Sequence, residues 1–213
     1  HLLEEVLGEG RGIRDFRKHI AWYLKGFVIG AQIRHQLGLV SSLEELDALM
    51  ADSRDYEVID RFTLPVDVQA LSVYPHAHYL GKDMLVLARR PNGKADTLLR
   101  IPNWNFNWQD DYDYAEPVSL PAGTRIDVRF SYDNSAANRR NPKQPPERVK
   151  WGPKSTDEMA AMWLEVQPTR PEDLSKLARD YAVRSLKMDI DGARTQVAMS
   201  PNDPLAHTFL ATK

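Results

Sequence analysis

The hydrophobic pattern in the first quarter of the chain has the period of an α-helix. Apolar residues recur at spacings of three and four, as in Ile13, Phe16 and Ile20. Several glycines interrupt this pattern, so it is typical of short helices and not of one long helix. We therefore predict a small α-helical bundle over residues 1–52.

The pattern changes between residues 57 and 168 into short runs that suit β-strands. Proline and glycine become more frequent, and turn sequences such as Pro91–Lys94 separate the runs. Many short strands with no strong helix between them predict an antiparallel β-sandwich of the jelly-roll type. The predicted strands are Phe62–Val68, Gln69–Tyr74, Met84–Arg89, Thr97–Ile101, Pro117–Leu120, Arg125–Tyr132 and Met159–Val166.

The helical period returns in residues 170–213. Pro171–Asp173 suits a first helical turn, because it combines proline with acids near the positive end of the helix dipole. A loop at Ser200–Pro204 then leads into a second helix. This helix, turn and helix resemble part of a tetratricopeptide array, so we expect the tail to contact another protein.

The fold class predicted from these patterns is mixed and multi-domain. It comprises an N-terminal helical bundle, a central β-sandwich and a C-terminal helical tail. The two unlike halves suggest a fusion, joined in the polar stretch between Met50 and Ile59.

Composition narrows the function classes. The net charge of −2 does not favour polyanion binding by the chain as a whole. The absence of cysteine excludes disulfides, zinc–thiolate sites, iron–sulfur clusters and cysteine nucleophiles. No apolar run approaches the roughly 20 residues that span a bilayer, so no membrane contact is expected. Because it starts at His1 and not at methionine, the sequence is typical of a fragment, and its localisation stays open.

Two histidines at a spacing of two are the strongest chemical signal. His76 and His78 lie in an apolar run predicted to be a strand, and alternate strand residues point to the same face. Two imidazoles side by side on one face are half of a metal site. The alternatives are a partly exposed pair, or a hydrogen-bonded pair, on the surface of a sheet.

A methionine completes a plausible ligand set. Met159 precedes a distant predicted strand, and its soft sulfur would favour Cu(I), whereas imidazole accepts both zinc and copper. Met84 and Met162 compete for this role, and methionine is more often core filler. The predicted copper ligands are His76, His78 and Met159, with one coordination position left open.

Residues 62–168 resemble a known family of enzymes. They are similar to the catalytic copper domain of the copper type II, ascorbate-dependent monooxygenases, the family of the peptidylglycine and dopamine monooxygenases. The resemblance implies a bound copper that activates dioxygen for C–H hydroxylation of a small molecule, with a reductant such as ascorbate. The matching blocks are Pro75–Gly81, Asn103–Gln109, Leu120–Thr124, Tyr132–Ser135 and Gly152–Met159.

The sequence departs from this family in two respects. The family's second copper is held by three histidines in a preceding domain, and no matching domain is recognisable here, so the electron source stays open. Where the peptide-processing members bind their substrate, this chain carries Tyr74, Ala161 and Trp163. A peptide C-terminus is therefore not the expected substrate.

Basic and aromatic residues alternate between residues 11 and 34. Basic residues mixed with aromatics can form a nucleic-acid surface, whereas the simpler interpretation is a solvated cationic helix face. The basic and histidine side chains considered for RNA contact are Arg14, Arg17, Lys18, His19 and Lys25.

Residues 1–50 resemble the C-terminal helical domain of bacterial tRNA-dihydrouridine synthases. The distinctive core is Arg17-Lys18-His19 followed by Trp22-Tyr23. The resemblance implies contact with tRNA through residues 11–34. The family's flavin-binding barrel and catalytic cysteine are not found in this sequence, so we expect an RNA-binding module without reductase activity.

Overall fold

The computed structural model describes residues 35–39, 50–149, 152, 154–199, 201–202 and 204–212. The chain divides into two compact units, residues 1–34 and 35–213, and every described residue belongs to the second. This boundary precedes the predicted join between Met50 and Ile59. The predicted helical bundle falls mostly outside the described residues, as do the candidate RNA contacts Arg14, Arg17, Lys18, His19 and Lys25.

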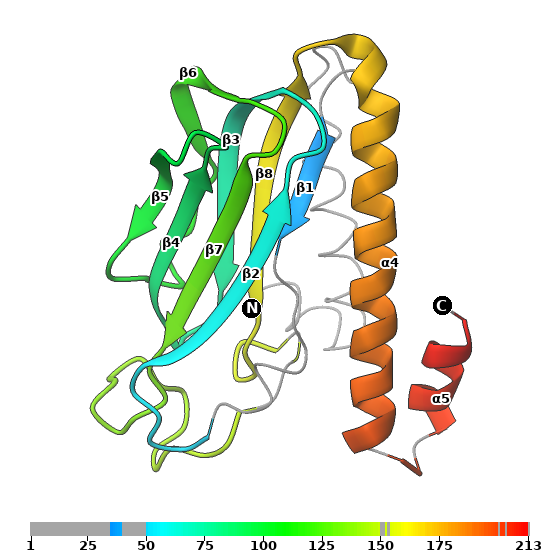
Figure 1. The fold of residues 1–213 in the computed structure, drawn as a ribbon. Helices are drawn as coiled ribbons and strands as arrows, with labels where there is room; N and C mark the ends of the chain where they lie inside the picture. Colours follow the sequence, from blue (N-terminus) through cyan, green and yellow to red (C-terminus); the bar gives the residue numbers. More distant parts are fainter. Residues whose placement is uncertain are drawn as a thin grey trace, which may run out of the picture. The chain divides into compact units, whose positions relative to one another are not determined.

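The second unit contains a β-sandwich of two four-stranded antiparallel sheets, as predicted (Figure 1). The strand order β1-β8-β3-β6 in one sheet and β2-β7-β4-β5 in the other is that of an eight-stranded jelly roll. The first sheet contains β1 (His35–Leu39), β8 (Ala160–Pro168), β3 (Val68–Ala77) and β6 (Tyr112–Leu120). The second contains β2 (Tyr56–Thr63), β7 (Arg125–Tyr132), β4 (Gly81–Arg89) and β5 (Ala95–Ile101).

Two strands differ from the sequence prediction. His35–Leu39, expected in the helical bundle, forms the edge strand β1 and pairs with β8 along its whole length. Gly38 within this run weakens a helix, and the free edge of β8 supplies backbone partners for a strand. The strand expected over Phe62–Val68 lies earlier, as β2, and ends at Thr63. Pro65 follows, and it has no N–H to donate to a ladder.

The core lies between the inner faces of the two sheets. Strand β8 shows the reason most clearly, because Ala160, Met162, Leu164 and Val166 are buried while the residues between them are partly exposed. This alternation places every second side chain between the sheets. The first sheet therefore has a second, outward face, on which the intervening residues lie.

A helical tail follows the sandwich, as predicted. It consists of a 3-10 turn η1 (Pro171–Asp173), α4 (Leu174–Met199) and α5 (Pro204–Ala211). Helix α4 packs on the sandwich through Leu177, which is fully buried, and through Arg184, whose guanidinium lies 5.7 Å from the Phe62 ring centre and pairs with Asp60. The likeness to a tetratricopeptide unit, and a protein contact through the tail, stay predictions.

The structure also bears on membrane contact. Within the part of the chain that the structure describes, no helix has both the length and the apolar character needed to cross a membrane.

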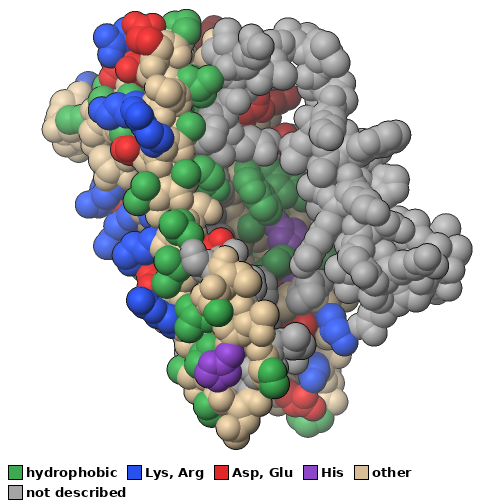
Figure 2. Space-filling model, turned by 90° about the vertical axis from the view of Figure 1, so that its right-hand side faces the viewer, with side chains coloured by type: hydrophobic (Ala, Val, Ile, Leu, Met, Phe, Trp, Pro, Cys, Tyr) green, Lys and Arg blue, Asp and Glu red, His purple; other side chains and the backbone are tan. Residues whose placement is uncertain are grey.

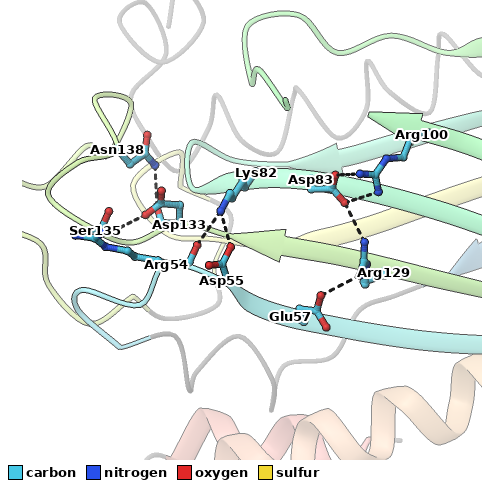
Figure 3. Close-up of polar contacts among 10 residues, drawn as sticks. All are labelled: Arg54, Asp55, Glu57, Lys82, Asp83, Arg100, Arg129, Asp133, Ser135 and Asn138. Carbon is cyan, nitrogen blue, oxygen red and sulfur yellow. Dashed lines mark hydrogen bonds and ion pairs between the residues drawn. The ribbon is translucent and has the colours of Figure 1, made fainter. Parts of the chain in front are cut away.

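The outward face of the second sheet carries paired charges (Figure 3). Arg129 lies 3.1 Å from Glu57 and 3.4 Å from Asp83, which also pairs with Arg100 at 2.8 Å. Exposed ion pairs of this kind contribute about 0–1 kcal/mol each. This face is therefore an ordinary solvated surface, and the candidate chemistry lies on the first sheet.

Candidate metal centre

The end of β3 brings the two histidines together on the outward face of the first sheet. Ala77, the last residue of β3, is fully buried in the core, so His76 lies on the opposite side of the strand, whereas His78 directly follows the strand instead of lying within it as predicted. Their ring centres are 5.2 Å apart and the rings are nearly perpendicular, at 84°. His76 is half-buried and His78 is only 4% exposed. Figure 2 shows histidine side chains (purple) and hydrophobic side chains (green) on one face of the molecule.

Met159 reaches the same place from the segment directly before β8. In the antiparallel register Ala77 pairs with Ala160. Met159, which precedes Ala160, therefore lies opposite His78, which follows Ala77. The Met159 Sδ atom lies 3.0 Å from Nε2 of His76. The competing methionines Met84 and Met162 are both fully buried in the core. The structure thus brings together the three predicted ligand residues and separates the two alternatives from them.

A glutamine fixes the tautomer of His76. The Gln109 amide nitrogen donates to the Phe106 carbonyl at 3.1 Å, which turns its oxygen towards the ring. That oxygen lies 2.6 Å from Nδ1 of His76 and can only accept, so Nδ1 carries the proton. The Nε2 lone pair of the neutral ring then faces the Met159 sulfur. Two electron-pair donors meet there, at a distance typical of ligands that share one metal ion.

A backbone carbonyl fixes the tautomer of His78. Its Nδ1 donates to the Asp157 carbonyl oxygen at 3.0 Å. A carbonyl oxygen only accepts, so Nδ1 carries a proton in this contact, and the Lys154 backbone also hydrogen-bonds to the same imidazole. Both histidines therefore use Nδ1 for a supporting hydrogen bond, which is how metal-binding imidazoles are commonly oriented.

Burial keeps both rings neutral. Burial lowers the pKa of His76, and the hydrogen bond that its ring donates to Gln109 only partly opposes this. Burial also lowers the pKa of His78 to about 4, against the opposing effect of the Asp157 carbonyl. Because a metal binds the neutral ring, both imidazoles are in the ligating form near neutral pH without losing a proton.

Aromatic side chains border the histidines. The Phe106 ring centre lies 5.5 Å from that of His78, 6.4 Å from that of His76 and 4.6 Å from that of Tyr79. On the same outward face Tyr74 and Trp163, opposite each other in the register, lie 5.4 Å apart. The pair of imidazoles therefore sits in a largely apolar surrounding, which raises the strength of any charge interaction within it.

Two supporting residues were not identified from the sequence. Gln109 lies in one of the sequence blocks that resemble the copper monooxygenases, but the sequence assigns it no part in the metal site. Glu158 directly precedes Met159. Glu158 is fully buried, and burial raises the pKa of its carboxyl to about 8 against the pull of three backbone N–H donors. The position of Glu158 next to the candidate ligand Met159 is the local sequence signal for this residue.

The third ligand decides which metal suits this site. Among the described residues, no group of three or more histidine, cysteine, aspartate or glutamate side chains converges as a metal site. Two imidazoles alone would bind a metal weakly, so a metal here would need a third ligand such as the Met159 thioether. A thioether favours Cu(I) over zinc, magnesium or calcium.

Comparison with known proteins gives a partial match. No family model matches the chain. Over 49 residues, 23% of its length, it is 55% identical to a probable tRNA-dihydrouridine synthase of Mycobacterium leprae and 51% identical to one of Mycobacterium tuberculosis. The chain spans only 13% of these relatives. The match supports a dihydrouridine-synthase-like segment, whereas the resemblance to copper monooxygenases is not among these matches and stays a prediction.

Solved structures show only distant likeness. A family 32 CBM of Clostridium perfringens NanJ, in complex with galactose, is 8% identical over 62% of this chain and 93% of its own, with a TM-score of 0.30. A second module, CBM32-1 from a family 31 glycoside hydrolase of Clostridium perfringens, is 8% identical over 63% of this chain and 96% of its own, with a TM-score of 0.24. Such scores establish no common fold.

Proposed function

We propose that the β-sandwich binds one copper ion through Nε2 of His76, Nε2 of His78 and Sδ of Met159. The observation that carries this proposal is the 3.0 Å separation of the His76 nitrogen and the Met159 sulfur, with Nδ1 of the same ring held by Gln109. Without a cation the contact sets two lone pairs against each other, and a shared Cu(I) would satisfy both.

The separation suits two ligands of one ion. Metal bonds of about 2.0 Å to imidazole nitrogen and about 2.3 Å to sulfur place the two ligand atoms roughly 3.0–3.5 Å apart, for angles at the metal between about 90° and 110°. The observed 3.0 Å lies at the short end of this range. Three protein ligands also leave one position for an exogenous molecule.

The chemistry we propose follows from the ligand set and the sequence resemblance. Copper bound here, with a reductant such as ascorbate, would supply dioxygen activation for hydroxylation of a C–H bond. The protein would hold the ligands, through Gln109 and the Asp157 carbonyl, and exclude water with Phe106. The aromatic pair Tyr74 and Trp163 offers a surface for a small molecule beside His76.

Copper titration tests the proposed site directly. Anaerobic titration with Cu(I) against a coloured competing chelator should show one tightly bound ion per chain. X-ray absorption of that complex should show two imidazole nitrogens and one sulfur as ligands. Binding no tighter than that of an unrelated protein, or a complex without the sulfur, would exclude this site.

A second candidate function comes from the dihydrouridine-synthase match. The names of the matched relatives point to tRNA, and the segment predicted to resemble them carries the candidate contacts Arg17 and Lys18. We infer that this segment binds tRNA chiefly through phosphate contacts. This activity would be independent of the copper site.

Electrophoretic retardation of bulk tRNA tests the second candidate. The double variant Arg17→Ala with Lys18→Ala should bind more weakly and show a salt dependence smaller by about two counterions, about one for each lost phosphate contact. The control removes the same charge from exposed positions of the second sheet, with Arg89→Ala and Arg125→Ala. Equal weakening by both double variants would indicate that only net charge matters.

A further inference from the structure

We propose that Glu158 is a positioning residue that sets the spacing between the strand end carrying His78 and the segment carrying Met159. This inference rests on the proposed copper site, because it concerns how two of its ligands are held. Glu158 itself contacts neither the Nε2 atoms nor the sulfur in this assignment, and it acts through the backbone of the ligand residues.

The carboxyl group of Glu158 joins the two segments by three hydrogen bonds. Its Oε1 accepts from the backbone N–H of His78 at 2.5 Å and from that of Met159 at 2.9 Å. Its Oε2 accepts from the backbone N–H of Leu80 at 3.0 Å. The side chain is fully buried, so these protein donors take the place of water. One rigid group thus holds residues that are 80 positions apart in sequence.

The opposite side of each ligand residue is held by a buried aromatic donor. The indole N–H of Trp104 donates to the His78 carbonyl at 3.0 Å, and the Tyr132 hydroxyl donates to the Met159 carbonyl at 3.1 Å. Trp104 is 1% exposed and Tyr132 is fully buried. Both ligand residues are therefore fixed at N–H and at C=O, which leaves little freedom for their side chains to separate.

The position of Glu158 explains why a carboxylate is used. Strand β3 ends at Ala77, so the N–H groups of His78 and Leu80 lie beyond its ladder. An apolar side chain at 158 would leave buried N–H groups without an acceptor. The two oxygens of the carboxyl group accept all three N–H groups, whereas the nitrogen of an amide can only donate.

The variant Glu158→Gln tests the role. We expect Cu(I) binding to weaken about 10–100-fold, as for other groups that orient metal ligands. X-ray absorption of the loaded variant should lose the sulfur signal and keep the two imidazole nitrogens, because the Met159 segment is released from the strand end. The matched control is Val86→Ala, which opens the core in the second sheet and should leave both measurements unchanged.

Each outcome decides between alternatives. Wild-type affinity and an intact sulfur signal in Glu158→Gln would overturn the role of Glu158 alone. Equal weakening in Val86→Ala would show a mere stability effect and would also overturn it. Failure of the wild-type protein to bind copper would instead overturn the proposed function, and this inference with it.

A measurement on the unaltered protein guards against a variant that does not fold. Hydrogen exchange in the metal-free wild type should show the amides of His78, Leu80 and Met159 among the slowest in the sandwich, because each donates to a buried carboxylate. Exchange at the rate of exposed loop amides would mean that the three bonds do not persist, and would overturn the inference.

Discussion

Replacing His78 with alanine is expected to weaken Cu(I) binding by more than about 100-fold, beyond the loss seen when only a supporting group is removed. The substitution deletes one of three proposed ligands, and no other described histidine ring packs against His76. The remaining nitrogen and sulfur would bind copper as a two-coordinate pair. The affinity is measured by competition with a chelator under anaerobic conditions.

The control for this variant is His207→Ala. His207 lies exposed on α5, where its ring contacts the Pro201 carbonyl, and it takes no part in the proposed site. Its loss should leave copper affinity unchanged. If both alanine variants bound copper as the wild type does, the ion would lie elsewhere and the proposed ligand set would be wrong.

Replacing Trp104 with alanine is expected to lower the free energy of unfolding by about 3–5 kcal/mol. The side chain is 1% exposed and is among the largest buried in the molecule. Its indole N–H also holds the His78 carbonyl, and its backbone N–H donates to Lys82 at 2.9 Å. It packs so closely on Gly81 that a methyl group there would lie 2.6 Å from its ring. The surroundings therefore have little room to collapse into the cavity.

The matched control is Trp108→Ala, four residues further along the same loop. Trp108 is 78% exposed, so its removal should change stability by no more than about 0.5 kcal/mol. Urea unfolding of both variants, followed by circular dichroism, gives the comparison. A loss below about 1 kcal/mol in Trp104→Ala would show that the packing around this indole is looser than the structure has it.

Local pattern accounts for much of the fold. Strand β8 alternates without exception between buried and partly exposed residues, and the predicted strand Arg125–Tyr132 agrees with β7 residue by residue. Strand β1 was missed because five residues containing a glycine give too short a signal beside a helical period. Such an edge strand forms because β8 offers it a partner, and this is information that the local sequence does not hold.

The candidate site shows the same division between local and distant information. The adjacency of His76 and His78 follows from their spacing of two, because alternate strand residues share a face. Gln109 and Glu158 depend on contacts across 33 and 80 residues, and no short-range period marks such contacts. Their roles follow from the three-dimensional structure, in which the loop after β5 and the segment before β8 contact the end of β3.

The pairing of β3 with β8 also sets the order of events in biosynthesis. His76 and Met159 are 83 positions apart in sequence, and they meet through a ladder that needs the last strand of the sandwich. A chain still on the ribosome, with β8 not yet synthesised, would lack a complete binding site. Copper binding at the proposed site would therefore have to follow closure of the β-sandwich. A copper donor acting on the emerging polypeptide would therefore meet only part of the proposed site.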